Sequence, residues 1–470
     1  MNEEEVTLNK VNLHDELAKV IQQQKCFFRS GKTLCVQNRI KKLKALKEVI
    51  IKYEQEIYSA LKIDLNKPEQ EAFLGEFMGT IHELDTSISK LKKWSRKSGA
   101  ASPLLLFPSK AWVTPEPYGQ VLIISPWNYP LDLCLSPLIG AIAAGNTAVV
   151  KPSELTPNTS ALIDVMVKEV FETEYVSVHL GGIELSTALL QCRFDYIFFT
   201  GSVEVGRIVM KAASKYLTPV TLELGGKCPV IVDEHVNIKQ VAKCVAWAKY
   251  FNAGQSCVAP DFILLPYNQE NDFISCFTDY TKEFLNSGLG DYTRIINKKH
   301  YERLTAYLIQ GEILYGGICS EDTLQITPTL IKPESMDCEL MQEEIFGPVL
   351  PVITYNSLDE ALEIINSREK PLVINIFSQK KQFVKQVTMS TSSGNVCIND
   401  VLLNYVNKNL PFGGVGNSGI GKYHGKASFD TFSHYKSVHQ KKAPDLPFRY
   451  PPYDRYQLLR RFKKLLNKNI

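Results

Sequence analysis

Cys257 is the residue in this sequence best placed for nucleophilic chemistry, because it follows a Gly-Gln-Ser segment after a stretch of helical periodicity. A thiol is a useful nucleophile only when local dipoles or cations favour the thiolate and the sulfur is accessible. A glycine-containing turn could supply backbone N–H groups and open that access. Most cysteines are small buried hydrophobic residues. The segment alone therefore leaves both interpretations open.

Two further polar residues lie at the ends of apolar runs. Glu223 stands between apolar neighbours and is followed by Leu-Gly-Gly. Burying a carboxylate is costly, so it suggests a general base, although a salt-bridged or strand-end glutamate is the simpler alternative. Asn128 lies between Pro126 and Pro130, which fix the backbone and could aim the amide at a developing oxyanion. An ordinary asparagine turn would give the same pattern.

A glycine-containing segment follows the apolar run Tyr196–Phe199 and opens a helical stretch. Its candidate binding residues are Gly201, Ser202, Val205 and Gly206. Backbone N–H groups at the start of a helix favour phosphate. The segment is not a G-x-G-x-x-G fingerprint, so by itself it does not identify a dinucleotide site.

The elements that must position these residues follow an α/β pattern. The first hundred residues show helical periodicity, with one amphipathic stripe from Ile40 to Leu61 and a second helical stretch from Phe77 to Trp94. Short apolar runs then alternate with amphipathic segments, which predicts parallel sheets covered by helices in two successive α/β domains. The expected strands are Val121–Ile124, Ala148–Val150, Tyr196–Phe199, Val220–Leu224, Phe262–Leu265, Val349–Ile353, Val373–Phe377 and Val396–Ile398. Segments around Trp112 and Leu403 fit neither domain and are expected to form a small extra sheet.

These segments, in this order, resemble the aldehyde dehydrogenase superfamily over nearly the whole chain. Further matches are Lys151-Pro-Ser-Glu154, the run from Glu343 to Pro348, the glycine-rich run Leu410–Gly419, Tyr423-His-Gly, Phe432-Ser-His434 and Arg449-Tyr-Pro-Pro452. The later matches are similar to the class 3 branch, which includes fatty-aldehyde dehydrogenases. One departure is Cys228, where the family usually has a small polar residue or alanine.

The resemblance implies a Rossmann-type cofactor domain, an α/β catalytic domain and a small oligomerisation sheet. The expected boundaries are 1–104 with 120–222 for cofactor binding and 223–400 for catalysis. Residues 105–119 and 401–445 are expected to bridge subunits, and 446–470 to form a basic tail. The class 3 likeness also implies a homodimer.

The same resemblance assigns roles to the candidate residues. It implies that Cys257 attacks an aldehyde, that the Asn128 amide and the Cys257 N–H hold the oxyanion, and that Glu223 activates the water that releases the acid. CoA-acylating relatives usually lack this glutamate, and a non-catalytic scaffold of the same fold would be expected to lose these residues. An apolar entry tunnel with Tyr129 and Trp247 is implied, which favours medium or long aliphatic and aromatic aldehydes, although both aromatics would also suit core packing.

The implied cofactor is NAD or NADP. Lys151 and Glu154 match the pair that meets the adenosine ribose, Gly201 to Gly206 match the segment near the pyrophosphate, and Glu344 and Phe346 match the nicotinamide ribose site. An acid at position 154 favours the ribose hydroxyls of NAD over a 2′-phosphate. Class 3 relatives often accept both cofactors, so NAD is only slightly favoured.

Composition limits the other possibilities. The net charge of +3 is too small for a nucleic-acid binder. Eleven cysteines without a C-x-x-C pair fit neither a disulfide framework nor a zinc site, and no secretory signal or apolar span is visible, so we expect a cytoplasmic protein. The tail from Tyr456 to Leu466 has one apolar and one basic face. It is expected either to pack on the protein surface or to lie on an acidic membrane.

Overall fold

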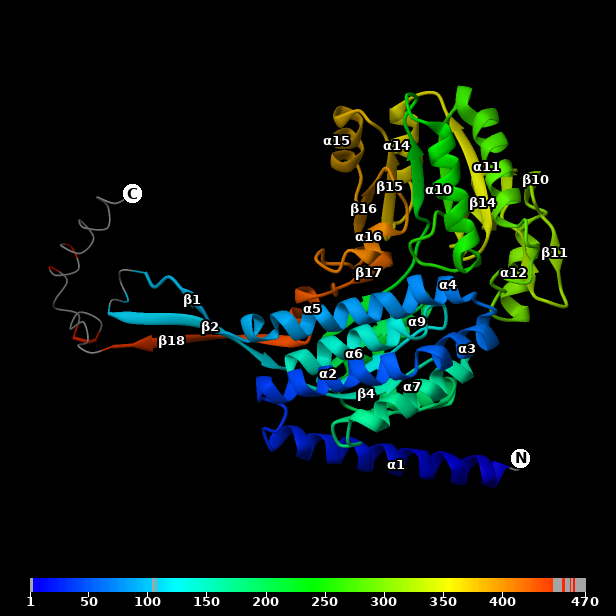
Figure 1. Ribbon diagram of the computed structural model, residues 1–470. Coiled ribbons are helices and arrows are strands. Elements are labelled where there is room, and N and C mark those ends of the chain that lie inside the picture. The colour runs from blue at the N-terminus through cyan, green and yellow to red at the C-terminus, as the bar shows by residue number, and fades with distance from the viewer. Residues whose placement is uncertain are drawn as a thin grey trace. The chain divides into compact units, whose positions relative to one another are not determined.

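The computed structural model describes residues 3–103, 106, 108–442, 450–452, 457 and 460, with side chains described from Leu13 onward. The chain divides into two compact units (Figure 1). The first comprises Met1–Trp94 and Pro117–His434, and the second comprises Ser95–Glu116 and Tyr435–Ile470. The predicted α/β class is confirmed. No helix in the described part is both long and apolar enough to cross a bilayer.

The first unit contains a six-stranded sheet with the order β17-β7-β6-β3-β4-β5, parallel except for β17. Its strands are β3 (Gln120–Ile124), β4 (Thr147–Lys151), β5 (Val176–Val178), β6 (Tyr196–Thr200), β7 (Val220–Glu223) and β17 (Gly419–Ile420). Every residue of β3 and β4 is buried. Continuous apolar runs suit such strands because helices cover both faces of a parallel sheet. The strands expected in this region are therefore confirmed.

Helices of the N-terminal region and of the βα connections surround this sheet. They are α1 (Glu3–Arg29), α2 (Val36–Lys52), α3 (Glu54–Leu65), α4 (Glu69–Ala72), the π-helix η1 (Phe73–Phe77), α5 (Met78–Trp94), α6 (Asp132–Ala144), α7 (Pro157–Val170), α8 (Ile183–Gln191) and α9 (Val203–Ser214). Helix α2 packs against α5, α6 and α7 (Figure 1). The stripe from Ile40 to Leu61 is divided between two helices, because Tyr53 leaves helical geometry with φ −97° and ψ 19°.

A second sheet follows in the same unit, with the order β10-β13-β14-β9-β8-β15-β16. Its strands are β8 (Pro229–Val232), β9 (Phe262–Pro266), β10 (Gly311–Tyr315), β13 (Thr329–Pro333), β14 (Val349–Tyr355), β15 (Val373–Phe377) and β16 (Asn395–Ile398). Its helices are α10 (Ile238–Tyr250), the 3-10 turn η3 (Phe251–Gly254), α11 (Glu270–Phe284), α12 (Lys298–Tyr307), α13 (Glu339–Gln342), α14 (Leu358–Asn366) and α15 (Lys381–Ser390). Strands β11 (Cys319–Ser320) and β12 (Gln325–Ile326) form a separate hairpin. The later set of expected strands is confirmed.

The second unit is built on a three-stranded sheet with the order β1-β2-β18. Its strands are β1 (Ser98–Ala100), β2 (Ser109–Pro117) and β18 (Ser433–Lys441). The expectation of a strand at Trp112 is confirmed, but the one at Leu403 is wrong, because α16 (Leu403–Val406) is a short helix. The missing partner is β18, whose mostly exposed polar residues gave no apolar signal. The expected tail helix from Tyr456 lies almost entirely outside the described residues.

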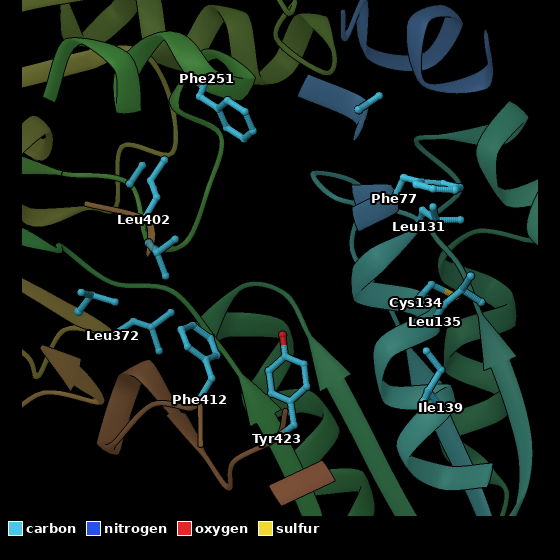
Figure 2. Packing of buried hydrophobic residues seen from close by; sticks show 14 of the residues in the cluster. Phe77, Leu131, Cys134, Leu135, Ile139, Phe251, Leu372, Leu402, Phe412 and Tyr423 are labelled. Carbon is cyan, nitrogen blue, oxygen red and sulfur yellow. The ribbon is translucent and has the colours of Figure 1, made fainter. Parts of the chain in front are cut away.

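A core of buried side chains joins the elements that carry the site (Figure 2). Leu131, Cys134, Leu135 and Ile139 lie along α6, which is buried at every position. Helix α17 (Lys426–Thr431) packs closely on α6, since a Cβ on Gly140 would lie 2.7 Å from the Cβ of Ser428. The elements beside the site are thus held in dense packing, which limits their movement.

Candidate active site

The sequence-predicted residues gather where the parallel strands of the first sheet end. Asn128 follows β3, Lys151 ends β4, Gly201 follows β6 and Glu223 ends β7. Residue pairs Ile124–Lys151 and Thr200–Glu223 lie side by side in the ladder. The carboxyl edge of such a sheet is where α/β proteins bind ligands, because the loops converge there.

Asn128 is buried and fixed through its backbone. Its carbonyl oxygen accepts hydrogen bonds from the Lys67 Nζ and the Asn252 side chain, each at 3.0 Å. Lys67 is in turn paired with Glu76 at 2.6 Å, and both side chains are fully buried. The Asn128 Nδ2 donates to the carbonyl of Gln255 at 3.1 Å, two residues before Cys257. The amide therefore faces the cysteine loop.

The Cys257 loop has a backbone that few residue types tolerate. Asn252 and Ala253 have φ of 53° and 51°, and Gly254 has φ 67°. A Cβ on Gly254 would lie 2.3 Å from the Gly347 carbonyl oxygen, so only glycine fits there. The Gln255 side chain closes the loop by donating to the Asn252 and Arg294 carbonyls at 3.1 and 3.0 Å.

The side chain of Cys257 is partly exposed. Burial raises its pKa, and the charges of Glu344 and Glu223 raise it further, while the N–H groups of Cys257 and Val258 act in the opposite direction. The resting form of the group is therefore the neutral thiol. A base must take its proton before the sulfur can attack.

Glu223 is a buried carboxyl group whose two oxygens have no hydrogen-bond partner. Burial raises its pKa well above the ordinary value. Its backbone is fixed, since it pairs with Gly419 of β17 and its carbonyl accepts from the Gly201 N–H at 3.1 Å. The oxygens lie close to the Gly413 backbone, where a Cβ would be 3.2 Å from Oε1. The carboxyl can therefore accept a proton or bind water without breaking an existing contact.

Glu344 lies on the loop between α13 and β14 and presses its carboxylate on Gly225, where a Cβ would lie 2.0 Å from Oε2. The Gly226 N–H donates to this carboxylate. Burial and the charge of Asp261 raise its pKa to about 8, against lowering by Gly226, Lys227 and Arg303. Next to it, Phe346 has φ 48° and meets the Trp127 ring edge-on at 5.4 Å.

The remaining candidate cofactor residues also line this edge. Lys151 forms an ion pair with Glu154. Ser202 caps α9 by accepting from the Val205 N–H at 3.4 Å, and Gly206 packs on Leu224, where a Cβ would lie 2.7 Å from Cδ2. A capped helix start at the same edge of the sheet as a lysine and a carboxylate suits a phosphate and a ribose, so these residues fit a dinucleotide.

Tyr129 and Trp247 meet through a third aromatic residue that the sequence did not single out. The ring of Phe251 lies 6.5 Å from Tyr129 and 5.2 Å from Trp247. Gly75 of η1 touches both Phe251 and Tyr129, and a Cβ there would lie 3.1 Å from each. The apolar path continues on η1 with Phe73 and Leu74, 40% and 39% exposed.

Sequence reasoning also missed two buried ion pairs, Lys67–Glu76 and Lys227–Asp261. The only signal for Lys227 was its place directly after Glu223-Leu-Gly-Gly. Lys67 stands nine residues before Glu76 with no motif around it. Pairing partners far apart in the sequence cannot be identified from spacing alone.

The model of the aldehyde dehydrogenase family matches residues 3–438 of this sequence. The chain belongs to the aldehyde dehydrogenase family. It is an enzyme that oxidises aldehydes to acids, and the predicted likeness to the class 3 branch is confirmed. The family uses NAD(P).

Relatives of this aldehyde dehydrogenase cover nearly its whole length. The 4,4'-diaponeurosporen-aldehyde dehydrogenase of Staphylococcus aureus is 46% identical, over 91% of this chain and 95% of its own. The mouse aldehyde dehydrogenase family 3 member A2 is 41% identical over 93% of each chain. The dog dimeric NADP-preferring aldehyde dehydrogenase is 40% identical over 93% of this chain and 98% of its own.

A solved structure agrees with the fold of this aldehyde dehydrogenase. The substrate-bound state of Staphylococcus aureus AldH matches with a TM-score of 0.92 and 44% identity, over 95% of this chain and 99% of the other. The predicted architecture is therefore confirmed.

Proposed function

We propose that the enzyme works through a thioester on Cys257 and hydrolyses it with Glu223. The observation that carries this proposal is the meeting of one thiol with an unpartnered buried carboxyl group and the Asn128 amide. The Cys257 thiol gives its proton to water, and the sulfur then attacks the aldehyde carbon and forms a thiohemiacetal. The Asn128 amide and the Cys257 N–H hold its oxyanion, each donor contributing about 3 kcal/mol.

The second half of the reaction releases the acid. Bound NAD(P) supplies the acceptor for the hydride that leaves the aldehyde carbon, with its two electrons. The carbon that has lost the hydride regains its C=O bond and remains bonded to the Cys257 sulfur as a thioester. Glu223 takes a proton from water as the water oxygen bonds to the acyl carbon, and the C–S bond breaks to return the thiolate. The presence of Glu223 favours hydrolysis over transfer of the acyl group to CoA.

The proposed substrates are medium or long aliphatic aldehydes and aromatic aldehydes. The side chains of Tyr129 and Phe251 adjoin η1, and Trp247 packs on Phe251. Phe73 and Leu74 of η1 are exposed and extend this apolar surface. Burying a CH₂ group against such a surface contributes about 0.8 kcal/mol. The Staphylococcus aureus relative is named for a 4,4'-diaponeurosporen-aldehyde, which agrees with an apolar substrate.

For the cofactor, we propose the residues Lys151, Glu154, Gly201, Ser202, Val205, Gly206, Glu344 and Phe346 as the NAD(P) site. The ion pair of Lys151 and Glu154 leaves a carboxylate that favours ribose hydroxyls and repels a 2′-phosphate. We therefore propose a slight preference for NAD.

The enzyme is proposed to be a homodimer. In the second unit, β1 is exposed at every residue and β18 at most of its residues. Small sheets with exposed edges are marginally stable alone and gain stability by pairing with another chain. The dog relative is named dimeric. Light scattering that gave a stable monomer at micromolar concentration would refute this.

A cytoplasmic location is proposed from the cysteines. All eleven, including Cys26 and Cys35 on the surface, are free thiols in the structure. Free thiols persist in a reducing compartment. Secretion of the native protein in an oxidised, cross-linked form would contradict this.

The deciding experiment is a steady-state screen of straight-chain aldehydes of increasing length, with an aromatic and a carboxylate-bearing aldehyde, each with NAD and with NADP. We expect kcat/KM to rise with chain length, and to be higher with NAD for the wild type. Replacing Glu154 by Gln should reduce that preference. Highest activity on the carboxylate-bearing aldehyde would overturn the proposed substrate class.

A further inference from the structure

We infer that the buried ion pair Lys227–Asp261 is a positioning device for Glu344, and so for cofactor binding. This inference rests on the proposed role of Glu344 at the cofactor. The pair lies outside the catalytic residues, and both side chains are almost completely buried. A buried ion pair is seldom the most stable solution for a protein core, so its retention calls for another explanation.

The two members of the pair hold the peptide groups on either side of Glu344. The Lys227 Nζ donates to the Glu343 carbonyl oxygen at 2.8 Å and to that of Leu340 at 2.8 Å. One Asp261 oxygen binds Lys227, while the other accepts from the Ile345 N–H at 2.9 Å. These hydrogen bonds therefore fix the backbone directly before and directly after Glu344.

Two further cations hold the same loop. Arg303 of α12 donates to the Ile345 carbonyl oxygen at 2.9 Å, and its other nitrogen lies 3.4 Å from that of Glu344. Lys249 of α10, fully buried, donates to the Gly347 carbonyl oxygen at 3.0 Å. The loop has no regular secondary structure between Gln342 and Val349, so side chains satisfy backbone groups that a helix or strand would otherwise pair.

These hydrogen bonds fix the loop between Gln342 and Val349, which includes a strained residue. Phe346 has φ 48°, a conformation that a bulky side chain adopts only when its surroundings impose it. The same peptide segment sets where the Glu344 carboxylate leaves the backbone. Displacement of a binding group by about 1 Å lowers rates strongly, on the order of 10²-fold in unfavourable cases.

Lys227 and Asp261 also connect this loop to the other half of the site. Lys227 follows Glu223 by four residues, and the Asp261 N–H donates to the Cys228 carbonyl at 2.7 Å. The Cys228 thiol in turn lies 3.3 Å from the Cys257 carbonyl oxygen. The pair therefore links the loop of Glu344 to the segments that carry Glu223 and Cys257.

The test is the double variant Lys227→Met/Asp261→Asn, which removes both charges together and leaves an acceptor for the Ile345 N–H. NADH binding is measured by fluorescence titration, beside KM for NAD, KM for aldehyde and the cofactor-free alkylation rate of Cys257 by iodoacetamide. We expect NADH affinity to fall on the order of tenfold. The alkylation rate and the aldehyde KM should stay within about twofold, and Lys227→Arg should recover most of the affinity.

A matched control removes another buried pair, in Lys67→Met/Glu76→Gln. That variant loses a comparable ion pair but touches the Asn128 carbonyl instead of the Glu344 loop. It should lower turnover while leaving NADH affinity within about twofold. Equal losses of NADH affinity in both double variants would show a general structural effect and overturn the inference.

Two more variants keep the outcomes separate. If Lys227→Met/Asp261→Asn does not fold, Arg303→Gln removes another donor to the Glu344 loop from a half-buried position. Unchanged NADH affinity in Arg303→Gln would then overturn the inference. Glu344→Gln tests the proposed cofactor role itself. Wild-type NADH affinity in Glu344→Gln would refute that role. Weakened binding in Glu344→Gln with wild-type affinity in the folded double variant would refute only the positioning by Lys227 and Asp261.

Discussion

Two carboxyl groups approach Cys257 from different regions of the molecule. Glu223 ends a strand of the first sheet, where its backbone is paired on both sides but its carboxyl oxygens contact no donor. Glu344 lies on an irregular loop of the second sheet, held by Lys227, Asp261 and Arg303, and accepts from the Gly226 N–H. Both have raised pKa values. Burial alone raises the pKa of Glu223, whereas nearby donors and cations oppose the effect of burial at Glu344, whose pKa is about 8.

The difference separates two uses of a buried carboxyl group. A group without partners can gain or lose a proton without breaking a contact, which suits a base that acts once in each cycle. A carboxyl group whose backbone is hydrogen-bonded on both sides keeps one position, which suits the binding of a cofactor. The predictions below are ordered by the size of the expected effect, and each tests whether the two carboxyl groups differ in this way.

The largest effect should come from the sulfur that both carboxyl groups adjoin. Cys257→Ala should abolish dehydrogenase activity and leave NADH binding intact, because no other covalent catalyst is proposed. Steady-state rates and a fluorescence titration measure the two. Cys228→Ala is the matched control and should keep most activity. Appreciable turnover in Cys257→Ala, or equal loss in both variants, would show that the nucleophile lies elsewhere.

Removing the unpartnered base should separate the two half-reactions. Glu223→Gln should still give one turnover of NADH, then stall as the acyl-enzyme, with steady-state kcat lower by about 10²-fold or more. Rapid mixing shows the burst, and intact mass shows the trapped acyl group. Glu184→Gln, an exposed acid on α8, serves as the control. Undiminished steady-state turnover in Glu223→Gln would contradict the base role.

Replacing Glu344, whose backbone is hydrogen-bonded on both sides, should have a smaller and different effect. At pH 9, above the Glu344 pKa of about 8, Glu344→Gln should raise KM for NAD about tenfold, by loss of a charged hydrogen bond of about 1.5–3 kcal/mol, with no trapped acyl group. Glu339→Gln, an exposed acid on α13, is the control. Accumulation of acyl-enzyme in Glu344→Gln would mean that the two carboxyl groups do not have separate tasks.

The sequence predicted the strands well, and it singled out candidate site residues at their ends, for a physical reason. Strands of a parallel sheet that has helices on both faces appear in the sequence as continuous apolar runs. Polar residues that follow these strands lie together at one edge of the sheet. Asn128, Glu223 and Gly201 were found in this way. Cys257 was singled out by its Gly-Gln-Ser segment and Glu344 by the resemblance alone, and the resemblance supplied the roles of all these residues.

What the sequence could not show depends on long-range contacts. Strand β18 is mostly polar and exposed, so the hydrophobic pattern pointed to Leu403 instead. Phe251 was not singled out, although its ring contacts both Tyr129 and Trp247. The hydrogen bond from Lys227 goes to the carbonyl oxygen of Glu343, 116 residues away. A contact with a backbone atom at that distance leaves no pattern in the sequence.

The smallest effect concerns the pH dependence of stability. A raised pKa in the folded state means that the folded protein keeps a proton which the unfolded chain loses above about pH 4.3. Each carboxyl group therefore stabilises the protein fully below that pH, and its contribution is lost as pH rises through the folded pKa. Glutamine carries no such dependence, so each Gln variant should gain stability over the wild type as the pH rises.

Glu344→Gln and Glu223→Gln should differ in the pH at which their gain in stability over the wild type levels off. For Glu344→Gln the difference in Tm from the wild type should grow from pH 5 and level off above about pH 8, the pKa of Glu344. For Glu223→Gln the difference should level off at a different pH, because burial raises the pKa of Glu223 well above the ordinary value and no contact opposes it. Calorimetry at half-unit steps from pH 5 to 9 measures both, with differences on the order of 2 °C. Identical curves would show that the partners of Glu344 do not distinguish it from Glu223.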